Sequence, residues 1–239
     1  MIRLATIFLA LNTAAAQAET ISVAVPANFL KPMQVIAERY ELKSGNSIIL
    51  HSGSSGQLYA QAINGAPFDV FLSADEERVD ALLKDNRAEQ AELYTCGKLA
   101  FYSQQHQITN IQELNQLTRI AIAKPNLAPY GKAAESTLSH IQQDFSAKLI
   151  YGQNVVATYQ YAMHNAVDGS FVAYSNVLKP DSGYVWLVPK ELYAPIKQKM
   201  AVLTSSKKQH SAQYLYRYIL SDEIQSLISE MGYTHIKDC

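Results

Sequence analysis

Two kinds of hydrophobic pattern alternate along most of the chain. Short apolar runs predict β-strands, and stretches whose apolar residues recur every three or four positions predict amphipathic helices. In the first part of the chain, strands are predicted at residues 20–27, 47–52 and 68–73, and helices at about 29–45, 58–63 and 76–83. Ser73 and Glu76 have the spacing of a capping box, which would start the last of these helices. This alternation is typical of a parallel or mixed sheet with helices on its faces.

A second series of strands and helices begins at residue 98. Strands are predicted at 98–103, 119–123, 147–152, 171–175 and 200–204, and helices at about 130–143, 156–167, 209–220 and 222–231. Two such series and a helical tail indicate an α/β protein of two lobes, although length alone fits one large domain equally well. We expect a first lobe of residues 19–98 plus 200–239, to which the tail returns, and a second lobe of residues 99–199.

The first eighteen residues have the pattern of an export signal. A single positive charge at Arg3 precedes an apolar run from Leu4 to Ala16, and the ending Ala16-Gln17-Ala18 has small residues at the positions that a signal peptidase reads. The apolar run is shorter than the ~20 residues that a membrane-spanning helix needs. We therefore expect cleavage after Ala18 and an exported mature chain.

The charge balance limits the kind of partner, and the two cysteines raise the question of a disulfide. The chain has 20 basic and 21 acidic residues, and loss of Arg3 with the leader leaves 19 against 21, a net charge of −2. This balance argues against nucleic acid as a partner, because nucleic-acid binding needs a concentrated basic face. Cys96 and Cys239 could form a disulfide in an oxidising compartment. Equally, Cys96 could be a small buried side chain and Cys239 a free thiol.

Candidate chemistry lies at four predicted strand-to-helix junctions. Their sequences are PANF (26–29), SGSSGQL (52–58), KPNLAPYGKAA (124–134) and GQNVVATY (152–159). A helix start has four backbone N–H groups without intrahelical acceptors and carries a partial positive charge, so it attracts anions without a charged side chain. Glycines at these junctions let the backbone approach a ligand, and Asn28, Ser55 and Tyr130 add side-chain donors. In open α/β sheets ligands lie beyond the carboxyl ends of the strands, where all four junctions should fall.

Each junction taken alone has a simpler interpretation, since serine and asparagine are the commonest helix caps. Repetition at four places favours a small anion held by uncharged dipoles. An enzyme is disfavoured, because Gly53-Ser54-Ser55-Gly56-Gln57 lacks the last glycine of a hydrolase nucleophile elbow. The six histidines are scattered without a metal-binding spacing. We expect no catalytic residue and no protein ligand to a metal ion.

Four stretches of the chain resemble the periplasmic molybdate-binding proteins of bacterial ABC importers. They are VAVPANFLKPM, SSGQLYAQAINGAPFDVFLSAD, IAIAKPNLAPYGKAA and ISEMGYT, and the resemblance covers nearly the whole mature chain. It implies a two-lobed periplasmic binding-protein fold, in which each lobe is a mixed sheet flanked by helices and the cleft between the lobes binds molybdate or tungstate. It also implies a monomer without a cofactor that delivers its ligand to a membrane permease.

Carried over position by position, the resemblance implies five oxyanion-binding residues. They are Asn28, Ser55, Tyr130, Val155 through its backbone N–H, and Tyr174. A protein of the same build that binds another oxyanion, such as sulfate or phosphate, is the nearest alternative, and an exported enzyme is a more distant one. The sequence does not rank molybdate against tungstate.

Overall fold

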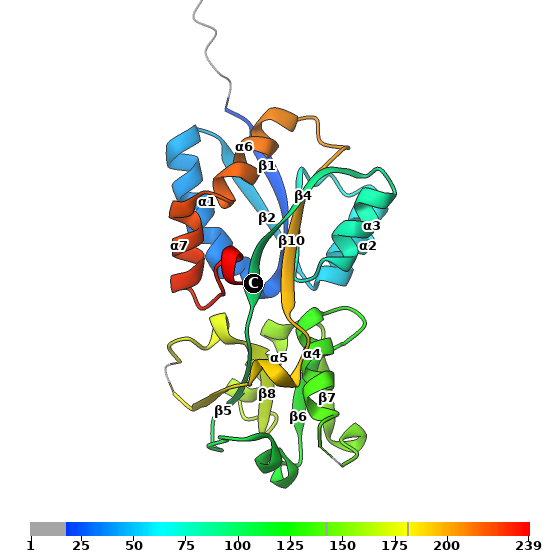
Figure 1. Cartoon of the computed structure of the whole chain (residues 1–239), viewed down its shortest axis with the longest axis vertical. Coiled ribbons are helices and arrows are strands. Elements are labelled where there is room, and N and C mark those ends of the chain that lie inside the picture. Colours follow the sequence, from blue (N-terminus) through cyan, green and yellow to red (C-terminus); the bar gives the residue numbers. More distant parts are fainter. Residues whose placement is uncertain (1–17, 142, 181) are drawn as a thin grey trace, which may run out of the picture.

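The computed structural model describes residues 18–141, 143–180 and 182–239 (Figure 1). The export signal expected at residues 1–18 lies, apart from Ala18, outside the described residues. Within the described ranges, no helix is both long enough and apolar enough to cross a membrane.

Two five-stranded sheets form the framework. Their orders are β2-β1-β3-β10-β4 and β7-β6-β8-β5-β9. The strands are β1 (Thr20–Pro26), β2 (Ser47–Gly53), β3 (Val70–Ser73), β4 (Ala88–Gly97), β5 (Leu99–Ser103), β6 (Ile120–Ala123), β7 (Leu149–Gly152), β8 (Gly169–Ala173), β9 (Tyr184–Leu187) and β10 (Ile196–Leu203). Both sheets are mixed: β1 runs parallel to β2 and β3, and β6 parallel to β7 and β8, whereas β10 and β5 pair antiparallel with their neighbours.

Helices cover the sheets and define two lobes, one above the other in Figure 1. The helices are α1 (Leu30–Ser44), α2 (Ser55–Ile63), α3 (Glu77–Lys84), α4 (Pro129–Leu138), α5 (Val155–Met163), α6 (Gln209–Ile219) and α7 (Asp222–Glu230). Short 3₁₀ turns lie at Ala27–Phe29 (η1), Ile111–Gln116 (η2), Ser146–Lys148 (η3), Tyr174–Asn176 (η4), Lys190–Leu192 (η5) and Ile236–Asp238 (η6). The two-lobed α/β fold expected from the sequence is confirmed.

Alternation along β1 explains how the first sheet is covered on both faces. Val23 and Val25 point into one apolar cluster with residues of α1, α6 and α7, whereas Ala24 points into another with residues of α2 and α3. Figure 1 shows α1 and α7 on one side of this sheet and α2 and α3 on the other. The helical tail therefore returns to the first lobe. The second lobe has its own apolar cluster, built around β5, β6 and β8.

The pattern analysis missed two strands and misplaced one helix cap. β4 and β9 were not predicted; both are edge strands with exposed positions, and β4 is polar over much of its length whereas β9 is an apolar run of only four residues. The capping box at Ser73 is wrong, because α3 begins later and its N-cap residue Glu76 makes no side-chain cap. Instead, the Asp75 carboxylate accepts from the backbone N–H of Arg78 at 3.2 Å.

The chain passes between the lobes beside a disulfide. Cys96, near the end of β4, is bonded to Cys239 at the end of the chain, which decides between the two alternatives for these cysteines. The backbone N–H of Thr234 also donates to the carbonyl of Cys96 at 2.9 Å, so the tail is held against β4 twice. Gly97 follows directly, and a Cβ there would overlap the hydroxyl of Tyr130 from the second lobe. This crossing point therefore requires glycine.

Candidate functional site

The four junctions converge on one small cavity between the lobes. They follow β1, β2, β6 and β7, each at the carboxyl end of its strand. The cavity is lined by Pro26, Ala27, Asn28, Gly53, Ser54, Ser55, Ala74, Ala128, Pro129, Tyr130, Asn154 and Val155. No charged side chain is present among these lining residues.

Four of the five residues expected at the site line this cavity: Asn28, Ser55, Tyr130 and Val155. Tyr174 is not among the lining residues. It begins the short turn η4, where its backbone N–H donates to the carbonyl of Lys98 at 2.9 Å. Ala74, which follows β3, lines the cavity although sequence analysis did not single it out.

The two serines at the start of α2 have different roles. Ser54 is the N-cap, and it forms a complete capping box with Gln57. Ser55 is the first helical residue, and its hydroxyl accepts from the backbone N–H of Ala74 at 2.9 Å. A hydroxyl that accepts one bond still has its own hydrogen to donate. Buried Ser55 therefore keeps a side-chain donor for a ligand in the cavity.

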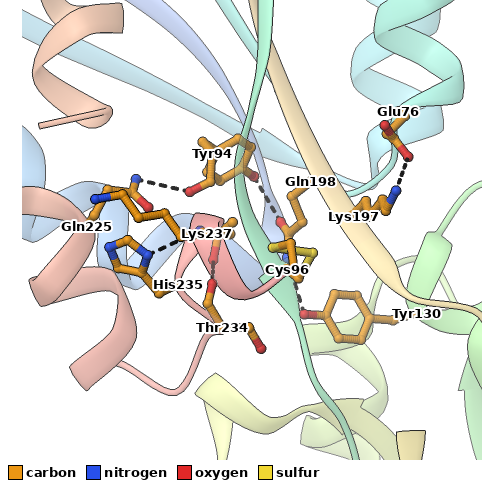
Figure 2. The surroundings of a disulfide bond; sticks show 12 residues. Glu76, Tyr94, Cys96, Tyr130, Lys197, Gln198, Gln225, Thr234, His235 and Lys237 are labelled. Atoms are coloured by element: carbon orange, nitrogen blue, oxygen red, sulfur yellow. Dashed lines mark hydrogen bonds and ion pairs between the residues drawn. A yellow bond between two sulfur atoms is a disulfide. The ribbon is translucent and has the colours of Figure 1, made fainter. Parts of the chain in front are cut away.

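The start of α4 brings backbone to the opposite side of the cavity. Pro129 occupies the first turn of the helix, and Tyr130 follows it. A Cβ on Gly131 would overlap the carbonyl oxygen of Ala123, so glycine is what lets this helix start press against the end of β6. The Tyr130 hydroxyl points toward Gln198, 3.4 Å from its Nε2 (Figure 2). Burial raises the pKa of this phenol well above its ordinary value, so it stays protonated.

The start of α5 adds a second backbone donor. Asn154 is the N-cap, and its Oδ1 accepts from the N–H groups of Val156 and Ala157, each at 3.0 Å. The N–H of Val155, the first helical residue, has no acceptor within the described residues. The same is true of the N–H groups of Tyr130 and Ser55, as expected for residues in the first turn of a helix.

The two lobes are also in direct contact beside the cavity. The N–H of Gly56 donates to the carbonyl of Leu127 at 2.9 Å, and Arg78 donates to the carbonyl of Asn126 at 2.9 Å. Arg78 is also paired with Asp75 on its own lobe, so its charge is balanced. These contacts join the first lobe to the loop that precedes α4.

A larger groove of about 1180 Å³ lies nearby between the lobes. It is lined by charges of both signs, several of which pair with one another, such as Lys132 with Glu77 at 4.0 Å and Lys197 with Glu76 at 3.8 Å. Size alone would favour this groove as the site. The small cavity is the better candidate for an anion, because only there do uncharged donors from four helix starts converge.

Comparison with known proteins agrees with this geometry. Residues 21–234 match the family of bacterial extracellular solute-binding proteins. The chain belongs to this family. Among curated proteins, the chain is 35% identical over 230 residues to the molybdate-binding protein ModA of Azotobacter vinelandii. The matched region covers 92% of this chain and 91% of that protein.

A second curated relative is the molybdate-binding protein ModA of Rhodobacter capsulatus, with 32% identity over 225 residues, 91% of this chain and 89% of that protein. The solved structure of the periplasmic molybdate-binding protein of Azotobacter vinelandii is similar in fold. Its TM-score is 0.84 at 28% identity, with 90% of this chain and 98% of that chain covered. These solute-binding proteins are thus similar to the chain along nearly their whole length.

Proposed function

We propose that this chain is an extracytoplasmic solute-binding protein that captures molybdate or tungstate and delivers it to the membrane permease of an ABC importer. The observation that carries the proposal is the convergence of four helix starts on one uncharged cavity. The names of the two curated ModA relatives support molybdate as the ligand. In this role the protein needs neither a catalytic residue nor a cofactor.

The donors of the cavity suit a tetrahedral dianion. Burying a doubly charged oxyanion is tolerable only if its oxygens accept several well-aligned hydrogen bonds. The Ser55 hydroxyl and the Asn28 amide would donate from one lobe, and the N–H groups of Tyr130 and Val155 from the other. Their helix dipoles add favourable potential without a counter-charge. Selectivity against sulfate would rest on cavity size, because sulfate has the same shape and charge with shorter bonds.

Ligand capture would proceed by closure of the lobes about the two segments that connect them. We propose residues 19–98 plus 200–239 as one lobe and 99–199 as the other, with the first four residues of β10 forming part of the connection. Because each lobe supplies half of the donors, an open form would bind the anion weakly and the closed form tightly. The mature protein would act as a periplasmic monomer after cleavage at Ala18.

Calorimetric titration of the mature protein with molybdate, tungstate, sulfate and phosphate tests the proposal. We expect saturable one-to-one binding of molybdate and tungstate, and much weaker binding of sulfate and phosphate. Preference for sulfate or phosphate would instead support a transporter of another oxyanion. Absence of binding to all four anions would overturn the oxyanion proposal.

A further inference from the structure

A buried hydrogen-bond network lies directly behind the Asn28 side of the cavity. Its centre is Gln198, a fully buried residue of β10. Gln198 Oε1 accepts from Asn28 Nδ2 at 3.0 Å and from the Tyr94 hydroxyl at 2.8 Å. Its Nε2 faces the Tyr130 hydroxyl at 3.4 Å. Figure 2 shows Gln198 between Tyr94 and Tyr130, at the point where the chain crosses between the lobes.

The tyrosines of this network act as neutral hydrogen-bonding groups. Burial raises the pKa values of Tyr94 and Tyr130 well above their ordinary value, so each keeps its proton. Tyr233, also buried, donates to the backbone carbonyl of Asn28 at 2.7 Å and accepts from the Ser175 hydroxyl at 3.0 Å. Each phenol can therefore donate one hydrogen bond and accept others, so that donor and acceptor roles along the network can be exchanged.

The donors of Asn28 are fully used in the observed arrangement. An amide NH₂ group has two hydrogens. In Asn28 they are directed to Gln198 Oε1 at 3.0 Å and to the Tyr233 hydroxyl at 3.2 Å. What this amide then has left to offer a ligand is its oxygen, which would repel an oxyanion. For Asn28 to donate to an anion, its amide must turn over.

We propose that Gln198 is a positioning residue that reverses its amide together with that of Asn28 when an oxyanion binds. This inference rests on the proposed function. After reversal, Asn28 Nδ2 faces the anion and Asn28 Oδ1 accepts from Gln198 Nε2. Gln198 Oε1 then accepts from the Tyr130 hydroxyl. The Tyr94 hydroxyl turns to the carbonyl of Ser73, which already lies 3.4 Å from it.

Every polar atom around Gln198 keeps a partner in both arrangements, so reversal leaves no buried group unsatisfied. Tyr233 loses the bond from Asn28 Nδ2 but keeps the one from Ser175. Only a side chain that both donates and accepts can support this exchange. A carboxylate can accept but not donate, and a thioether has no hydrogen to give. Because of this reversal, binding of an anion in the cavity also changes the hydrogen bonding of Tyr130 in the second lobe.

Variants of Gln198 test the inference by molybdate calorimetry on the mature protein. Gln198→Met is expected to weaken binding about tenfold, because the reversed Asn28 amide loses its donor. Gln198→Glu is expected to weaken it more, because the carboxylate holds the Asn28 NH₂ group and adds negative charge near the anion. Gln225→Met is the matched control. Gln225 is another buried glutamine, whose Nε2 donates to the carbonyls of Tyr94 and Ile219 outside the cavity, and its replacement should leave affinity unchanged.

A double-mutant cycle separates positioning from general loosening of the fold. In an Asn28→Ala background, Gln198→Met should change molybdate affinity by less than about twofold, since the amide that it positions is gone. An equal effect of Gln198→Met with and without the Asn28 amide would overturn the inference, as would a Gln198→Glu variant that binds as tightly as wild type. If wild type binds none of the oxyanions, the proposed function itself fails.

Side-chain amide resonances of the wild-type protein give a second readout that does not depend on variants folding. Molybdate should shift the ¹⁵N–¹H signals of both Asn28 and Gln198, while those of Gln225 stay in place. Unchanged Gln198 signals in a protein saturated with molybdate would also overturn the inference.

Discussion

The two sides of the cavity offer different kinds of hydrogen-bond donor. From the first lobe come two side chains, the Asn28 amide and the Ser55 hydroxyl, each already engaged with other buried groups, and beside them the backbone N–H of Ser55. From the second lobe come backbone N–H groups, those of Tyr130 and Val155, set at the starts of two helices. The same physical requirement, an uncharged donor aimed at one point, is thus met in two ways.

This difference indicates where the anion preference can change. A side-chain donor can be exchanged, lengthened or turned by one substitution. A backbone donor keeps its place for any residue except proline, because the helix start fixes it. We therefore expect the first side to set which anion fits and the second side to supply attraction that is largely independent of side-chain identity.

Val155→Pro gives the largest expected effect on molybdate binding, because it removes one backbone donor and little else. Proline is tolerated as the first residue of a helix, and Asn154 before it is already extended, at φ −154° and ψ 173°. We expect a loss of about 2–3 kcal/mol in molybdate binding free energy by calorimetry. Val155→Ala keeps the N–H and should cost less than about 0.5 kcal/mol. Equal losses for the two variants would contradict a backbone role.

Ser55→Ala tests the side-chain half of the comparison. We expect a loss of about 1–2 kcal/mol in molybdate binding, together with lower stability, because the buried N–H of Ala74 loses its acceptor. Ser54→Ala is the matched control, since Ser54 caps the same helix. It should lower the free energy of unfolding by about 0.5–2 kcal/mol while changing affinity less than Ser55→Ala does. A larger loss of affinity for Ser54→Ala than for Ser55→Ala would show that Ser54 is the serine that binds the anion.

Loss of the disulfide should lower the stability of the fold and leave the cavity unchanged. Cys96 and Cys239 hold the tail to β4 in the first lobe, and neither residue lines the cavity. Replacing both with serine should lower the free energy of unfolding by about 2–4 kcal/mol, measured by urea denaturation. Molybdate affinity below the unfolding transition should stay within about twofold of wild type. A large loss of affinity in the folded variant would show that the tail also shapes the site.

Alkaline pH should have the smallest effect on binding, because no charged side chain lines the cavity. Affinity for molybdate should stay flat from about pH 7 to 9, where neither amides nor hydroxyls titrate. Stability should respond only at higher pH. Burial raises the pKa values of Tyr94 and Tyr130, so their contribution is fully present below the unfolded pKa of about 10 and is lost as pH rises beyond it. Binding that weakens steadily between pH 7 and 9 would indicate that a cationic side chain, which loses its proton in this range, holds the anion instead.

Sequence patterns predicted the backbone features of the site, because these features depend on residues that are close together in the chain. Gly131 permits a close approach of helix to strand, and Asn154 caps its helix as its sequence position indicates. The serine pair at 54 and 55 showed that donors were present at a helix start. It did not show that the Ser55 hydroxyl accepts from the backbone N–H of Ala74, because Ala74 follows a different strand, β3.

Features that depend on distant contacts could not be predicted in this way. β4 is an edge strand whose outward positions are polar, so its sequence does not resemble a buried strand. Gln198 can be noticed in the sequence, because it occupies a core-facing position of β10 between Ile196 and Met200. A polar residue there indicates a buried partner, but the partners come from residues 28, 94 and 130, which only the fold brings together.

A crystal structure of the mature protein with molybdate tests the central claim most directly. We predict the oxyanion in the small cavity, with its oxygens within hydrogen-bonding distance of the Asn28 amide nitrogen, the Ser55 hydroxyl and the backbone nitrogens of Tyr130 and Val155. Molybdate bound instead in the larger groove, beside lysines 124 and 132, would contradict the claim that uncharged dipoles from the two lobes hold the anion.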